Sequence, residues 1–338
     1  MNKTKILNDY FYIRRIRLIN ARCSRALQVR AEFKYFDSGF DEYEEFKKKS
    51  LERLINAKIR FGEESLLNNL FFLDKKWLFL NHGAFGATLK ILLKESLMLR
   101  EICERQPLLF TDRILNHLIL NSIHRMAFAL NCPSDELIPI QNCTFGMNSI
   151  VKSIKFNPDD EIVCLSITYK STKIIMSDVA AINSIHFNII NISFPIISKI
   201  EFLSEFKRLL KRTTKLIVLD EITSYTAIKL PVLEMAVLCR QVNPNMIIVI
   251  DGAHSLFAQD VRIYPRINDK NPSSHQEITK VCTNSIGSTA DFYLMNCHKW
   301  LCSPKGCGFL WHHPRTRAYL KPAVLSNDYK VVPHDTLL

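Results

Sequence analysis

Two strand-like segments of this 338-residue chain end in side chains that could do chemistry together. The apolar run Met246–Ile250 leads into Asp251, and a carboxylate at a strand end can cap a helix, bind a metal or pair with a cationic ligand nitrogen. A second apolar run leads into His298 and Lys299. A lysine among apolar residues has a lowered pKa and can act as a Schiff-base nucleophile. Taken alone, a helix cap and a surface lysine are the ordinary interpretations.

A third segment suggests a phosphate site. Cys143 and Thr144 open a helical stretch, where backbone N–H groups and a hydroxyl can bind phosphate. The Gly-Lys-Ser/Thr of a Walker loop does not follow, and a plain capping turn has a similar sequence. Together, the three segments supply a phosphate cradle, a carboxylate for a ring nitrogen and a nucleophilic lysine. These are the parts that a pyridoxal phosphate (PLP) site needs.

Alternating strand-like and helix-like segments must position these side chains. The β-rich runs lie at 161–167, 184–190, 215–219, 246–250, 290–294 and 308–311. Helical patterns occur at 112–130, 148–155, 199–211 and 232–242. This alternation predicts an α/β fold with a largely parallel sheet, whose carboxyl edge would hold the functional groups.

The sequence resembles the class V aminotransferases of fold type I, nearest the branch named for isopenicillin-N epimerase. The resemblance runs from about residue 61 to 322, through the segments 80–86, 142–148, 220–224, 251–254 and 296–300. It implies a PLP-binding large domain with a mostly parallel mixed sheet flanked by helices. It also implies a homodimer that acts on an amino acid or a sulfur-containing amino acid.

The resemblance also implies a role for individual residues. Lys299 would form the internal aldimine with PLP, and Asp251 would hold the proton on the pyridinium nitrogen. These two are the predicted catalytic residues. The other predicted cofactor contacts are Cys143, Thr144, Asn296 and His298 at the phosphate, Tyr169 stacked on the ring, His254 near the phenolic oxygen, and Ser224. Asn81 and His82 would line the substrate side.

Several positions depart from the family pattern. Family members usually have Ala at Cys143, a small hydroxyl residue at Ala84 and Gly near Phe257. Relatives continue into a small C-terminal domain with an arginine for the substrate carboxylate, which nothing in residues 323–338 matches. The alternative hypothesis is therefore a truncated PLP-binding relative with little or no catalysis, acting as a partner or regulatory subunit.

Four parts of the chain are predicted from these patterns. They are a basic N-terminal helical extension at 1–38, a helical segment at 39–75, the PLP-binding large domain at 76–322 with an insertion near 262–289, and an atypical tail at 323–338. The net charge of +12 is uneven, because residues 1–30 hold eight basic residues and one acidic residue, or +7. The remaining +5 is spread over residues 31–338, so we predict no nucleic-acid partner.

Location is the other inference that the composition allows. Apolar runs fall far short of the roughly 20 residues that a membrane helix needs, so we predict no membrane partner. The Arg-rich, amphipathic extension suits a mitochondrial targeting segment, and a solvated extension is the alternative. We therefore predict an intracellular protein of the cytoplasm or the mitochondrial matrix.

The ten cysteines include no Cys-x-x-Cys pair, which favours free thiols in a reducing compartment. Cys297, Cys302 and Cys307 are five residues apart, and this spacing without a matching His pair is weak evidence for zinc. We predict no metal site and three buried, inert thiols.

Overall fold

The structure, a computed structural model, describes residues 69–196, 198–265 and 285–324, together with 43, 45–49 and 52. The predicted extension at 1–38 lies outside the described residues. So do most of the predicted insertion, at 266–284, and most of the predicted tail, at 325–338. The described residues of the segment 39–75 include helical ones at 43, 45–49 and 52.

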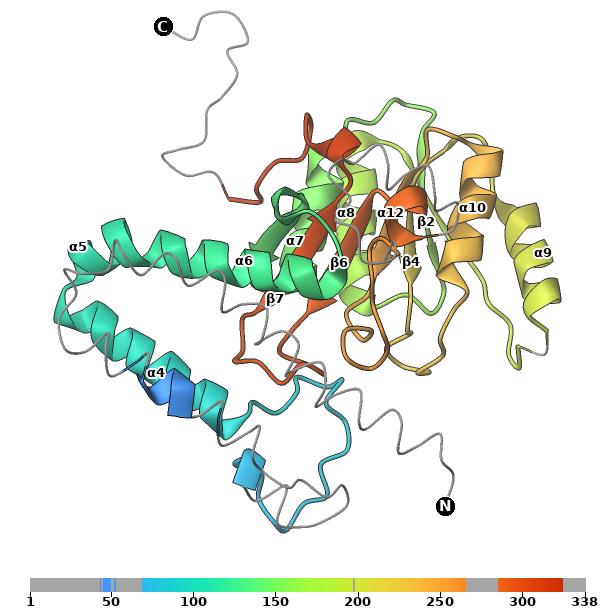
Figure 1. The fold of residues 1–338 in the computed structure, drawn as a ribbon. Helices are drawn as coiled ribbons and strands as arrows, with labels where there is room; N and C mark the ends of the chain where they lie inside the picture. The colour runs from blue at the N-terminus through green and yellow to red at the C-terminus, as the bar shows by residue number, and fades with distance from the viewer. Residues whose placement is uncertain are drawn as a thin grey trace, which may run out of the picture.

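One seven-stranded sheet forms the centre of the molecule (Figure 1). Its strands are β1 (Leu137–Ile140), β2 (Glu161–Leu165), β3 (His186–Ile190), β4 (Thr214–Asp220), β5 (Ile247–Asp251), β6 (Phe292–Asn296) and β7 (Gly308–His312). Their order across the sheet is β1-β7-β6-β5-β4-β2-β3. The pairs from β6 to β3 are parallel, and β7 runs antiparallel to both of its neighbours. The predicted mostly parallel, mixed sheet is confirmed.

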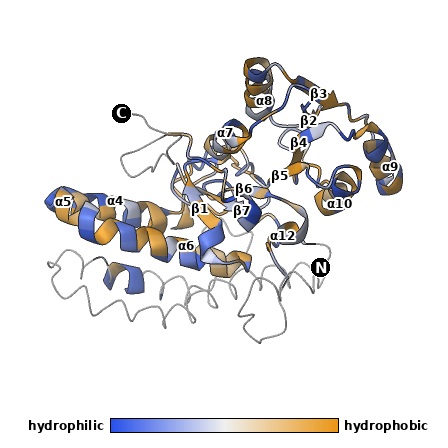
Figure 2. Ribbon diagram, turned by 90° about the horizontal axis from the view of Figure 1, so that it is seen from above, coloured by the Kyte–Doolittle hydropathy of each residue, from blue (hydrophilic) through white to orange (hydrophobic). Residues whose placement is uncertain are grey.

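Helices cover both faces of this sheet (Figure 2). One face carries α7 (Cys143–Ser153) and α8 (Lys170–Asn183), and the other carries α6 (Asn116–Leu130), α9 (Lys199–Leu209), α10 (Val232–Val242) and α12 (Ile286–Thr289). A helical hairpin extends to one side, made of α4 (Lys90–Arg105), α5 (Pro107–Leu109), the π-helix η2 (Phe110–Leu115) and α6. The short 3-10 helices are η3 (Ser134–Glu136) and η4 (Pro314–Thr316).

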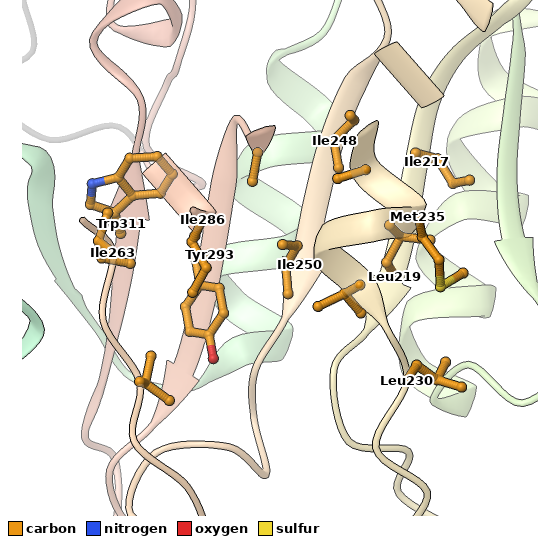
Figure 3. Close-up of a cluster of buried hydrophobic side chains, with 14 of the residues drawn as sticks. Ile217, Leu219, Leu230, Met235, Ile248, Ile250, Ile263, Ile286, Tyr293 and Trp311 are labelled. Carbon is orange, nitrogen blue, oxygen red and sulfur yellow. The ribbon is translucent and has the colours of Figure 1, made fainter. Parts of the chain in front are cut away.

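The side chains of each central strand divide between two cores. In β5, Ile248 and Ile250 join the core under α10, whereas Ile247 and Val249 join the core under α7 and α8. This alternation follows from the two-residue period of a strand. Because both faces are covered, the central strands are apolar throughout, as Figure 3 shows for the α10 face. The strand ends are thereby held rigidly, and the functional side chains lie on them.

Two elements differ from the sequence prediction. The edge strand β1 was not predicted, because its four residues include Pro139, which lacks an N–H and is tolerated only at a sheet edge. The helix predicted at 148–155 begins earlier, at Cys143, because the Asn142 side chain caps it by accepting the Phe145 N–H at 2.9 Å. Within the described part of the chain, no helix is long and apolar enough to cross a membrane.

Candidate active site

The carboxyl ends of β4, β5 and the segment after β6 bring three ionisable groups together. Asp220 and Asp251 are paired residues at the ends of two adjacent parallel strands. Lys299 follows β6, and its Nζ lies 3.0 Å from His254 Nε2, in a hydrogen bond whose donor depends on the histidine tautomer. The side chains of Lys299 and Asp251 also interact electrostatically. The sequence-predicted residues Asp251, His254 and Lys299 therefore lie in one cluster.

Burial lowers the pKa of both basic groups of the cluster. It lowers the pKa of Lys299, although the charges of Asp251 and Cys143 oppose this shift. Burial and the charge of Lys299 lower the pKa of His254 to about 4. At neutral pH His254 is therefore uncharged, and Lys299 loses its proton more readily than an exposed lysine. An unprotonated amine is the nucleophilic form.

Asp251 keeps part of its hydrogen-bonding capacity unused. Its Oδ1 accepts the Ala253 N–H at 3.0 Å, and among the described residues no donor to Oδ2 is recorded. Burial raises the pKa of Asp251, while the Ala253 amide and Lys299 oppose that shift. A buried carboxylate in this state is stabilised by a ligand that brings a positive N–H to the free oxygen.

A second buried carboxylate, Asp220, was not among the predicted site residues. Its Oδ2 accepts the Thr168 hydroxyl at 2.6 Å, and its Oδ1 accepts the Tyr169 N–H at 3.4 Å. Burial and the neighbouring Asp251 raise the pKa of Asp220 to about 7. The sequence held a signal for it, because an Asp ends an apolar run at 220 just as one does at 251.

The start of α7 is the predicted phosphate site. The Cys143 N–H, predicted to face the phosphate, donates instead to Asn296 Oδ1 at 3.0 Å, which ties α7 to the end of β6. The Phe145 N–H is taken by the cap residue Asn142. Within the described residues no acceptor is recorded for the Thr144 N–H, and Thr144 is exposed. Thr144 is thus the donor that the first turn leaves for an anion.

The segment 81–86 packs directly on the loop that carries Lys299. Gly86 has a φ of +70°, and a Cβ at this position would lie 2.0 Å from the carbonyl oxygen of His298. A Cβ at Gly83 would lie 2.9 Å from His254 Nδ1. Lys305 Nζ also donates to the Gly86 carbonyl at 2.6 Å. Only glycine permits these close approaches, so the glycines of the segment set its position against the site.

The two residues predicted for the substrate side lie on this segment. His82 Nδ1 accepts the Ala87 N–H at 3.3 Å and lies 3.6 Å from Cys302 Sγ, and its ring centroid is 6.1 Å from that of Trp300. Burial and the charge of Lys305 lower the pKa of His82. Asn81 is exposed and accepts the Ala84 N–H at 3.1 Å. In the described part of the chain neither residue has a recorded hydrogen bond to Lys299 or Asp251.

Three predicted residues lie around the cluster. Tyr169 precedes α8, is 39% exposed and stacks on Tyr225 with the ring centroids 6.3 Å apart. His298 Nδ1 lies 3.0 Å from the Cys307 carbonyl oxygen. Ser224 is partly buried between β4 and α10, and no side-chain hydrogen bond is recorded for it within the described residues. Tyr169 reaches the cluster through its backbone bond to Asp220.

Comparison with known proteins shows what this chain is similar to. The family described as "Aminotransferase class-V" matches residues 117–264. An L-cysteine desulfhydrase-like protein, lolT2 of Epichloe uncinata, is 24% identical over 276 residues, which cover 80% of this chain and 54% of that protein. The chain spans about half the length of the curated relatives it matches.

Solved structures share the fold. A C-DES mutant with glycine covalently linked to its PLP cofactor has a TM-score of 0.58 at 16% identity, covering 76% of this chain and 60% of that one. The cystine C–S lyase C-DES, in complex with its product cysteine persulfide, has a TM-score of 0.57 at 17% identity, covering 72% of this chain and 59% of that one.

The chain is therefore similar to the class V aminotransferases over residues 117–264, and it shares its fold with PLP-binding enzymes. Phe257 shows one physical consequence of departing from the family pattern. It has a φ of +68°, in the left-handed region that favours glycine, and the resemblance described above implies a glycine near this position.

Proposed function

We propose that this chain is a PLP-dependent enzyme that cleaves or rearranges a sulfur-containing amino acid, with Lys299 as the amine that holds the cofactor. The observation that carries the proposal is the buried Lys299–His254 pair beside Asp251, whose second oxygen has no recorded donor among the described residues. The names of the relatives, an L-cysteine desulfhydrase-like protein and a cystine C–S lyase, support the sulfur-containing substrate. The epimerase branch stays a prediction.

The residues present fit PLP. The free Oδ2 of Asp251 would bind the protonated pyridine nitrogen. Among the described residues no arginine donates to this buried carboxylate, so the ligand would supply the missing positive charge. The Thr144 N–H and hydroxyl, at the positive end of the α7 dipole, would bind the phosphate. His298 would stand beside the phosphate, the Tyr169 ring would cover the pyridine face, and Ser224 would complete the cofactor contacts. Asn296 would position Thr144 indirectly, by fixing the Cys143 amide.

Each residue of the cluster then has a defined task. When bound, PLP supplies an aldehyde carbon for the amine and a protonated ring that accepts electrons from the substrate's α-carbon. Lys299 Nζ, whose pKa burial lowers, would accept the proton from that carbon. His254 Nε2 orients this amine, and its lowered pKa keeps it from competing as a cation. Asp251 would keep the ring nitrogen protonated, and the segment 81–86 packs on the loop that carries Lys299.

We also propose that the protein is a homodimer. Five large apolar side chains of the segment 72–85 lie in solvent although they adjoin the site, with exposures of 65% for Phe72, 78% for Trp77 and Leu78, 72% for Leu80 and 81% for Phe85. A second copy would cover such a patch. Light scattering on the purified chain should give twice the monomer mass, and Trp77→Ser should lower the dimer fraction. A monomeric wild type at micromolar concentration would contradict this proposal.

The central test is cofactor binding to the purified chain. PLP should produce a visible absorbance band in the wild type and in Lys152→Ala, a control that removes an exposed lysine of α7. Lys299→Ala should lack the band and lose at least about 100-fold in cysteine-dependent formation of sulfide or pyruvate. Borohydride reduction should fix the cofactor to the peptide that contains Lys299. Persistence of the band in Lys299→Ala would contradict the proposal that Lys299 holds the cofactor.

A further inference from the structure

Two cysteines face each other across the hairpin that follows the active-site strand. The register of β6 and β7 pairs Asn296 with Gly308, and one step further along the same register places Cys297 opposite Cys307. The Cys297 N–H donates to the Cys307 carbonyl at 3.0 Å, so the two backbones stay paired at this step. Opposed Cα atoms of antiparallel strands lie about 4.5–5.5 Å apart. That separation falls within the range that a disulfide spans.

The two thiols also interact with each other, and their pKa values differ. A side-chain hydrogen bond from Cys297, supported by one from Ser303, lowers the pKa of the Cys307 thiol to about 7, although burial opposes the shift. The same contact, together with burial, raises the pKa of Cys297 well above its ordinary value. Cys307 is partly exposed, whereas Cys297 is 1% exposed. The prediction of a buried thiol is therefore wrong for Cys307, which is partly exposed.

A two-step oxidation to a disulfide requires one thiol that reacts with the oxidant and a second that attacks the oxidised sulfur, and the two cysteines suit these different roles. A thiolate that reaches solvent near neutral pH is the form that attacks an oxidant. The protonated thiol of Cys297, on the paired strand opposite Cys307, is positioned to attack the oxidised sulfur. The third cysteine of the cluster is placed differently, because Cys302 Sγ lies 3.6 Å from His82 and burial raises its pKa.

Metal binding does not compete with this chemistry in the described part of the chain. There, no group of three or more His, Cys, Asp or Glu side chains could hold a metal ion. Both cysteines are free thiols.

We propose that Cys297 and Cys307 form a reversible redox site, a dithiol that a hydroperoxide converts into an intramolecular disulfide. The Cys307 thiolate attacks a peroxide oxygen, the O–O bond breaks, and the sulfur becomes a sulfenic acid. The leaving oxygen departs as hydroxide from hydrogen peroxide, or as alkoxide from an organic hydroperoxide, and takes up the proton that Cys307 released when it ionised. The Cys297 sulfur then attacks that sulfur, the S–S bond forms, and hydroxide leaves with the Cys297 proton as water. Two thiols lose two electrons and the peroxide gains them. A small dithiol reverses the step by thiol–disulfide exchange.

The disulfide would join the two strands beside Lys299. The Cys307 carbonyl already accepts the N–H groups of Cys297 and His298, at 3.0 and 3.3 Å, and lies 3.0 Å from His298 Nδ1. Oxidation would thus act two residues from the proposed catalytic amine. The redox site does not depend on the proposed function, because the thiols react whether or not PLP binds.

The experiment is peptide mapping of the purified full chain after mild treatment with hydrogen peroxide. Trypsin separates the two cysteines into the peptides 281–299 and 306–315. The first also holds Cys282, so a Cys282→Ser background leaves one cysteine in each peptide. We expect these peptides to be recovered as one species, two hydrogens lighter than their sum, and to separate after dithiothreitol.

Matched variants decide the outcome. Cys307→Ser and Cys297→Ser should each abolish the linked species, whereas Cys103→Ser, which removes another partly exposed thiol, should leave it unchanged. Circular dichroism of each variant checks that the fold is retained. Recovery of the two peptides unlinked, with Cys307 as a sulfinic acid, would overturn the proposal, as would linkage of Cys307 to Cys302. A loss of PLP binding in Lys299→Ala would leave the expected linkage intact.

Discussion

Two buried aspartates, one at the amino ends and one at the carboxyl ends of the parallel strands, have opposite surroundings. Before β6, Asp291 is 3% exposed and receives Arg240 Nη2 at 2.6 Å, Arg315 Nε at 2.5 Å and the Ile248 N–H at 2.8 Å. At the end of β5, Asp251 is 6% exposed and receives the Ala253 N–H alone among recorded donors in the described residues. Asp251 also interacts electrostatically with Lys299, whose own pKa burial lowers.

The contrast separates a structural carboxylate from a functional one. A buried charge whose partners are complete contributes to holding the fold together, because removing either side leaves the other uncompensated. A buried carboxylate without a full set of partners has a raised pKa and is stabilised by a ligand that supplies the missing cation. Asp251 and Asp220 lie at the carboxyl edge, where α/β sheets bind their ligands, and Asp291 lies at the opposite edge.

The largest expected loss of stability comes from removing the charge of Asp291, whose hydrogen-bond partners are complete. Asp291→Asn should lower the free energy of unfolding by about 3 kcal/mol, because two guanidinium groups lose their charged partner. Asp251→Asn should change it much less, because no arginine depends on that carboxylate in the described structure. Denaturant unfolding of the cofactor-free proteins at pH 7 measures both.

Adding cofactor should reverse the ranking of these two variants. A ligand that binds only the folded state stabilises it by about 2.7 kcal/mol at a concentration of 100 Kd. Asp291→Asn should gain this stabilisation from PLP as the wild type does, whereas Asp251→Asn should gain little. Equal gains in both variants would show that Asp251 does not bind the cofactor.

A pair of glycines tests how tightly the segment 81–86 is docked on the site. Gly86 and Gly306 both have positive φ, +70° and +78°, so alanine costs each about 1–2 kcal/mol of backbone strain. At Gly86 the new Cβ would also meet the His298 carbonyl, whereas at Gly306 nothing lies within 4 Å. Gly86→Ala should therefore lose more stability than Gly306→Ala and should also weaken PLP binding. Equal losses in thermal unfolding and in PLP titration would mean that the segment is not held against Lys299.

The fold and the local part of the site were predictable because they depend on neighbours in sequence. The continuous apolar runs of β4 and β5 and the aspartate that ends each of them are visible without a structure. Asp251 and Lys299 were found in this way. The edge strand β1 was not, because a short run that contains Pro139 does not show the pattern.

The missing parts of the site depend on distant partners. The Thr168–Asp220 bond joins residues 52 positions apart, and it exists because β2 and β4 are neighbours in the sheet. The Cys143–Asn296 bond spans 153 positions and occupies an amide that was predicted to bind phosphate. Such contacts follow from strand order and register, which local periodicity does not determine.

The smallest expected effect is the pH dependence that Asp220 and His254 give to folding, on the order of 1 kcal/mol after solvent screening. Asp220 has a folded pKa of about 7 against an ordinary 3.8, so the folded state binds the extra proton and its stability falls as pH rises through that interval. His254 has a folded pKa of about 4 against an ordinary 6.5, so the unfolded state binds the extra proton and stability rises as pH rises from 4 to 6.5.

The two slopes oppose each other in the wild type. Asp220→Asn should therefore make stability rise more steeply with pH across this range, and His254→Gln should make it fall. Parallel curves for all three proteins in urea unfolding at pH 4.5, 5.5 and 6.5 would place both groups in solvent-like surroundings, and the contrast with Asp291 would then fail.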